Sequence, residues 1–69
     1  MKVGSVLKLK GPPRPDFFLE KHGWLWVYEG KGGLGWHMFR SVASGSIENA
    51  RYPQRVFENW EDEDEAKEG

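Results

Sequence analysis

Two aromatic-rich apolar segments on either side of a glycine-rich turn constrain this chain more than any other feature. Residues 24–28 read Trp-Leu-Trp-Val-Tyr, residues 33–40 read Gly-Leu-Gly-Trp-His-Met-Phe-Arg, and together they hold three of the four tryptophans. Residues 29–33 between them have the composition of a hairpin connection. With Lys31 at the centre of the turn, Tyr28 faces Leu34 and Trp26 faces Trp36. The pairing therefore predicts a hairpin with one aromatic face, formed by Trp24, Trp26, Tyr28, Trp36 and Met38.

The length of 69 residues and the absence of cysteine limit how such a chain is stabilised. One small domain is the most that this length supports, and no disulfide or thiolate metal site can reinforce it. His22 and His37 have no neighbours at ligand spacing, so we expect neither a metal nor a cofactor. Stability must come from packing, chiefly of the four tryptophans, four phenylalanines and two tyrosines.

Three further strands are predicted around the hairpin. Residues 2–10 alternate, with Leu7 and Leu9 on the apolar face, as in a half-buried strand. Residues 11–16 form a stiff proline-rich loop, residues 17–19 return the chain to the core, and residues 20–23 form a turn. Residues 41–46 form a turn after the third strand. Residues 47–52 predict a fourth strand, and residues 52–57 a short helical turn followed by a final strand.

Residues 3–11, Val-Gly-Ser-Val-Leu-Lys-Leu-Lys-Gly, resemble the first strand of small SH3-like and KOW-type barrels. The order of strand, proline-rich loop and tight hairpin also resembles the SH3-like layout across residues 1–60. The resemblance implies an all-β domain over residues 1–60: a small five-stranded SH3-like barrel with a long Pro-rich first loop. The acidic peptide-binding loop and tyrosine-rich opening of SH3 domains are not present, so proline-peptide recognition is not implied.

The net charge of -1 conceals two regions of opposite sign. Residues 1–60 contain nine Lys/Arg and five Asp/Glu, whereas residues 61–69 contain one Lys and six Asp/Glu. The second region has almost no apolar residue, which predicts a disordered acidic C-terminal tail. Such a tail usually improves solubility. A sharper hypothesis is that it masks a basic surface of the domain.

The aromatic face, together with Arg40, is the main candidate for partner binding: Trp24, Trp26, Tyr28, Trp36 and Arg40. Two interpretations of this face stay open: it is a binding surface, or it is the core of the domain. Large aromatic side chains are more often buried in a core than exposed. Three indoles and a phenol are nevertheless bulky for so small a barrel. We therefore expect at least one of Trp24 and Trp36 to be substantially exposed.

Basic residues interleaved with aromatic ones suggest a nucleic-acid surface as the alternative. The cations expected to meet phosphates are Lys8, Lys10, Lys31, Arg40 and Arg51. A body charge of only +4 and six nearby carboxylates weigh against this alternative.

Other motifs carry little chemistry. Residues 30–35 match G-x-G-x-x-G, but a strand and not a helix is expected to follow, so nucleotide binding is not predicted. Residues 12–15 have PxxP spacing, and a stiff loop is their simpler interpretation. Ser41, Ser44 and Ser46 lie near His37 in sequence, with no acid placed to orient the histidine, so no catalytic residues are assigned.

The sequence as a whole predicts a small non-enzymatic protein-binding module, acting as an adaptor, accessory subunit or inhibitor. Its expected partner is another protein, and it is expected to be a monomer or weak homodimer. With no signal peptide or membrane span expected, a cytoplasmic location is predicted. The alternative is a nucleic-acid or ribonucleoprotein-associated KOW-like module whose acidic tail masks a basic surface.

Overall fold

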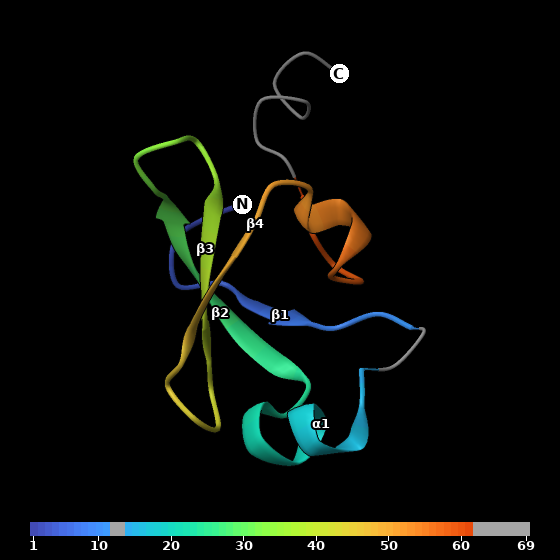
Figure 1. Ribbon diagram of the computed structural model, residues 1–69. Coiled ribbons are helices and arrows are strands. Elements are labelled where there is room, and N and C mark those ends of the chain that lie inside the picture. The colour runs from blue at the N-terminus through green and yellow to red at the C-terminus, as the bar shows by residue number, and fades with distance from the viewer. Residues whose placement is uncertain (12–13, 62–69) are drawn as a thin grey trace.

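A four-stranded antiparallel sheet in the order β1-β2-β3-β4 forms the centre of the structure. The computed structural model describes residues 1–11 and 14–61. The strands are β1 (Val6–Lys8), β2 (Leu25–Lys31), β3 (His37–Ser41) and β4 (Ile47–Ala50). Helix α1 (Asp16–His22) precedes β2, and the 3₁₀ turn η1 (Pro53–Arg55) follows β4, as Figure 1 shows. The predicted small, mostly β domain is confirmed, while the predicted tail falls almost wholly outside the described residues.

Among the described residues the sheet has four strands and does not close, so the structure does not show the predicted five-stranded barrel. The fourth strand ends at Ala50 and not at residue 52, since Pro53 begins η1 and proline cannot donate to a ladder. The predicted final strand is reduced to one bridge, between Phe57 and Leu9. Residues after η1 thus return to β1, whereas β4 stays an edge of the sheet.

One face of the sheet carries the hydrophobic core. Its buried members are Leu7, Leu9, Trp26, Tyr28, Phe39 and Phe57, with Phe18, Leu19, Val56 and Trp60 packed against them. The predicted inward positions of Leu7 and Leu9 are confirmed. The strand itself is shorter than predicted, since β1 begins only at Val6. Each buried aromatic ring contributes a large apolar area, so the core is built from few side chains.

The predicted hairpin register is wrong. Trp26 pairs with Ser41 and Tyr28 pairs with Phe39, so Trp26 and Trp36 do not face each other. β2 continues through Lys31, and the turn lies after it, where the Gly32 N–H donates to the Trp36 carbonyl at 2.7 Å. An irregularity between Tyr28 and Gly30 shifts the pairing by one residue. Gly30 accommodates it at φ +103°, a conformation that other residues rarely adopt.

The predicted turn over residues 20–23 is also wrong, because Asp16–His22 is helical. Pro15 precedes the first turn, and an acidic residue, Asp16, begins the helix, a favourable arrangement for the helix dipole. Gly23, at φ +72°, ends the helix, and its N–H donates to the Leu19 carbonyl at 2.8 Å. Phe18 and Leu19 pack against the core as expected, whereas Phe17 is 75% exposed.

Candidate functional site

The predicted aromatic face is divided between core and surface. Trp26 and Tyr28 are only 2% and 6% exposed, so both belong to the core and not to an exposed aromatic face. Trp24 and Trp36 are 38% and 41% exposed, which confirms the expectation that at least one of them would be accessible. They precede β2 and β3 respectively, at opposite ends of the hairpin, roughly 20 Å apart by strand length. They do not form one patch.

Arg40 lies on the outer face of the sheet, opposite the core. The register places it in a row across all four strands with Val6, Val27 and Ile47. Its guanidinium contacts a Glu29 carboxylate oxygen at 3.3 Å. Arg40 is therefore separated from the buried aromatic residues by the sheet itself.

The cations of the nucleic-acid alternative are spread over both ends of the sheet. Lys8 pairs with Leu25 at the start of β2, and Lys10 follows β1 at that same end. Lys31 ends β2, and Arg51 follows β4 near the same end, because Lys31, His37 and Ala50 are aligned. These cations do not line one continuous groove.

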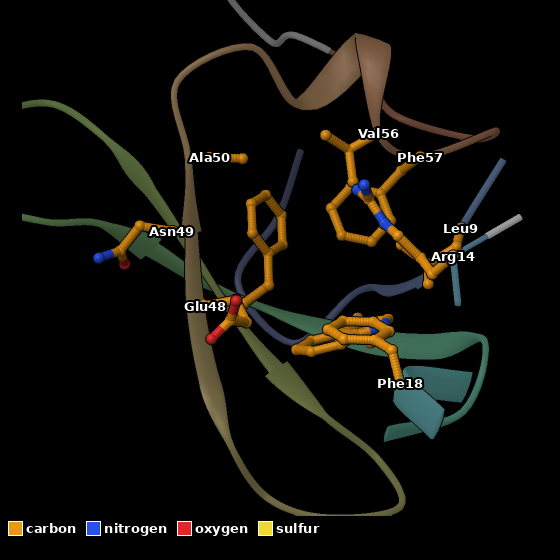
Figure 2. A pocket seen from close by; sticks show the side chains of 10 residues that line it. Leu9, Arg14, Phe18, Glu48, Asn49, Ala50, Val56 and Phe57 are labelled. Atoms are coloured by element: carbon orange, nitrogen blue, oxygen red, sulfur yellow. The ribbon is translucent and has the colours of Figure 1, made fainter. Parts of the chain in front are cut away.

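An apolar pocket of about 320 Å³ opens where the sheet fails to close. Figure 2 shows Glu48 and Ala50 of β4 along one side, with Leu9, Arg14, Val56 and Phe57 on the other and Phe18 below. Trp26 and Phe39 from the core and Asn49 of β4 complete the lining, so four of the lining residues are aromatic. Such a hollow suits an apolar or aromatic side chain.

The indole N–H of Trp26 is the one buried side-chain polar atom in the described part of the chain that lacks a hydrogen-bond partner. The ring stacks on Phe18 of α1, with 6.1 Å between the ring centroids. A buried donor without an acceptor costs about 1–3 kcal/mol. One wall of the pocket is thus formed by an indole whose N–H is buried without an acceptor.

The backbone of β4 leaves an open edge beside this pocket. The Ser41 N–H donates to the Ser46 carbonyl at 2.9 Å. Because hydrogen-bonded pairs alternate in an antiparallel ladder, the polar backbone groups of Glu48 and Ala50 point toward β3, and those of Ile47 and Asn49 point away from it. Within residues 1–11 and 14–61, no other backbone segment hydrogen-bonds to Ile47 or Asn49 on that side.

A second apolar hollow lies on the other side of the open edge. It is lined by Gly32, Gly33, Leu34, Trp36, Met38 and Asn49. Asn49 also lines the first pocket, so the edge of β4 runs between two hollows. Figure 2 shows the Asn49 side chain on the side of β4 away from Ala50. The structure thus places the exposed Trp36 beside this edge, whereas Trp24 lines a separate hollow with Lys8 and Leu25.

The histidines and serines pair differently from their order in sequence. His22 Nδ1 and Ser44 Oγ are 2.6 Å apart, whereas His37 Nδ1 is 2.8 Å from the Tyr28 hydroxyl. In the part of the chain that the structure describes, no three His, Asp or Glu side chains gather closely enough for a metal. No helix of the described residues is long and apolar enough to span a membrane. None of these groups forms a site with evident chemistry.

Sequence reasoning missed the pocket, because Phe18, Trp26, Phe39 and Phe57 come from four separate segments. The only signal for it was that Pro53 interrupts the segment after β4, which leaves the outer edge of that strand without a partner among the described residues. The chain matches no protein-family model, no curated protein and no solved structure.

Proposed function

We propose that this protein is a small protein-binding module without enzymatic activity, which takes an extended segment of a partner protein along the edge of β4. The observation that carries the proposal is that an unpaired strand edge lies between two apolar hollows and shares Asn49 with both. An added strand would receive backbone hydrogen bonds from Ile47 and Asn49. Its alternate side chains would enter the pocket and the hollow of Trp36, which gives both affinity and selectivity.

The experiment begins with selection of ten-residue random peptides displayed on phage against the full chain. The affinities of the enriched peptides are then measured by calorimetry for the wild type and for Asn49→Pro. Proline removes the outward N–H without touching the groups that face β3. We expect a loss of affinity of at least about tenfold. Asn49→Ala is the matched control, since it keeps the N–H.

A second pair of variants tests the pocket. Ala50→Leu fills part of the pocket and should weaken the same peptides, whereas Ala43→Leu makes the same change at an exposed turn position. Circular dichroism verifies that each variant is folded. Absence of enriched peptides, or equal affinity for wild type, Asn49→Pro and Ala50→Leu, would contradict binding at this edge.

We also propose that the fold is related to SH3-like barrels. What supports it is the element order, with a long first connection, a central hairpin, a fourth strand, a 3₁₀ turn and a return to β1 through Leu9 and Phe57. Protection of the Glu58 N–H, which donates to the Lys8 carbonyl, against hydrogen exchange would support it. Residues 57–59 detached from β1 would contradict it.

A nucleic-acid function is the second candidate, and one observation favours it. Arg51 and Arg55 both lie over the ring of Tyr52, with 5.5 Å and 5.0 Å to its centroid. Tyr52 is about half exposed, so this basic-aromatic cluster is accessible. Anisotropy of a labelled single-stranded oligonucleotide tests it. Binding should fall steeply between about 50 and about 200 mM salt, and should increase after removal of residues 61–69 if the tail masks the surface.

A further inference from the structure

We infer that the segment bound at β4 runs antiparallel to it and carries, from its N-terminus, an aromatic, an apolar, a basic and an aliphatic residue. This inference rests on the proposed function and specifies the partner. The four positions face Ala50, Asn49, Glu48 and Ile47 in that order, because antiparallel pairing reverses the direction of the chain. The antiparallel direction is favoured because parallel pairing is slightly less stable per residue.

The aromatic position follows from Ala50. Paired residues share a face of the sheet, and Ala50 borders the pocket, as Figure 2 shows. Its methyl group leaves the space opposite it empty, so a large side chain fits there. The lining offers rings from Phe18, Trp26, Phe39 and Phe57, and the Arg14 guanidinium provides a cation that can lie over an incoming ring.

The basic position follows from Glu48. Its side chain is on the pocket side of β4 and exposed, and it has no ion-pair partner within the described residues. A lysine or arginine directly opposite places its long apolar stem along the pocket and its charge against the carboxylate. An acidic residue there would meet a like charge and lose its hydration beside apolar walls.

The same glutamate disfavours a second copy of the chain as the occupant. A two-fold antiparallel pairing of β4 with itself that uses the outward groups of both Ile47 and Asn49 places Glu48 opposite Glu48 of the other copy. Like charges directly opposite are destabilising. A heterologous partner with a basic residue avoids this repulsion.

The remaining two positions face the outer side of the sheet. The residue opposite Asn49 lies next to the hollow of Leu34, Trp36 and Met38, so an apolar side chain is favoured there. The residue opposite Ile47 meets an aliphatic side chain that is 44% exposed. A β-branched residue suits that position.

The test uses two synthetic peptides, Gly-Ser-Phe-Leu-Arg-Val-Ser-Gly and the same sequence with glutamate in place of arginine. The wild type should bind the arginine peptide about threefold to tenfold more tightly, and Glu48→Lys should reverse this preference. Glu58→Lys makes the same charge change beside β1, and the wild-type preference should persist there. A peptide with the central order Val-Arg-Leu-Phe should bind more weakly than Phe-Leu-Arg-Val.

Each contrary result has a distinct meaning. An unchanged preference in Glu48→Lys overturns the assigned register, and equal binding of the reversed peptide overturns the antiparallel direction. If both peptides fail while selected peptides still depend on Asn49, the residue pattern is wrong and the proposed function stands. If no peptide depends on Asn49, both fall. Ultracentrifugation of the free protein detects the second copy, and a dimer dispersed by Asn49→Pro would also overturn the inference.

Discussion

The two edges of the sheet differ in whether another segment of the chain hydrogen-bonds to them. Along β1, the Lys10 N–H donates to the Val56 carbonyl at 2.9 Å, and the Glu58 N–H donates to the Lys8 carbonyl at 2.8 Å. The Asn59 side chain adds two further bonds, to the Lys8 N–H and the Val6 carbonyl. Along β4, no described segment supplies comparable bonds on the outer side of Ile47 and Asn49.

Unpaired edges invite pairing with other chains, so proteins generally cover or shorten them. Within the described residues, the chain covers one edge with its own C-terminal segment and leaves the other open beside an aromatic-lined pocket. The difference indicates that the open edge is not a general failure to protect the sheet. It is confined to the place where side chains of an added strand would find hollows on both faces.

Removing the cover of β1 should produce the largest effect. Phe57 is 3% exposed and its ring lies 4.5 Å from that of Phe39, so Phe57→Ala should reduce the free energy of unfolding by about 3–5 kcal/mol. Urea denaturation followed by circular dichroism measures the change. Phe17→Ala is the matched control at an exposed position and should change stability by about 0.5 kcal/mol or less. Equal stability of the two variants would contradict the anchoring of residues 57–59.

A single asparagine on each edge sharpens the comparison. Asn59→Ala removes two exposed hydrogen bonds and should lower the free energy of unfolding by about 1 kcal/mol, with faster amide exchange at Lys8. Asn49→Ala makes the same change on the open edge, where no described residue hydrogen-bonds to the side chain, and should have almost no effect. The comparison fails if both variants lose equal stability.

The exposed tryptophans separate binding from stability. Trp36→Ala should change the free energy of unfolding by less than about 1 kcal/mol, yet lower the affinity of peptides bound at β4 about threefold to tenfold, since Trp36 lines the outer hollow. Trp24→Ala removes an equally exposed indole from a hollow beside β1 and should leave that affinity unchanged. Calorimetric titration with the selected peptides measures both. A larger loss with Trp24→Ala would move the partner surface to the β1 side.

The smallest effect is expected on the outer face between the edges. The Arg40–Glu29 pair is half exposed, so Arg40→Gln should cost at most about 0.5 kcal/mol and less in high salt. Thermal denaturation at low and high salt, with Glu29→Gln and the double variant, gives the coupling between the two charges. A coupling above about 1 kcal/mol would show that this face contributes more to stability than either exposed charge suggests.

The sequence supports the prediction of local structure better than that of pairing. Alternation in residues 2–10 predicts the inward positions of Leu7 and Leu9, and the glycine-rich connection predicts that the two central strands form a hairpin. The register is not predictable, because the irregularity between Tyr28 and Gly30 and the displacement of the turn from residues 29–33 to residues 32–36 change the partner of Trp26 from Trp36 to Ser41. A shift of one residue in pairing exchanges the two faces of a strand, so a face predicted from the register is only as sound as the turn.

The candidate site was even less accessible to sequence reasoning. The helix over Asp16–His22 was not predicted, because its Phe-Phe-Leu segment is also typical of an extended apolar segment that packs against the core. Pro15 and Gly23, which lie at its two ends, are the signals that indicate a helix. The pocket depends on that helix, since Phe18 stacks on Trp26. A hollow assembled from residues distant in sequence leaves no periodic signal. Trp36 was predicted as a partner contact and stays a prediction.

The position of Trp26 also gives the molecule an internal optical reporter. Its indole is buried at the pocket wall, whereas Trp24 and Trp36 are in contact with solvent. Its fluorescence should therefore be emitted at shorter wavelength and be less quenched by acrylamide than theirs. A ligand that enters the pocket would alter the emission of Trp26, and one that also fills the outer hollow would alter that of Trp36. Occupancy of the pocket can therefore be followed in the unlabelled protein as the part of the change that is lost in Trp26→Phe.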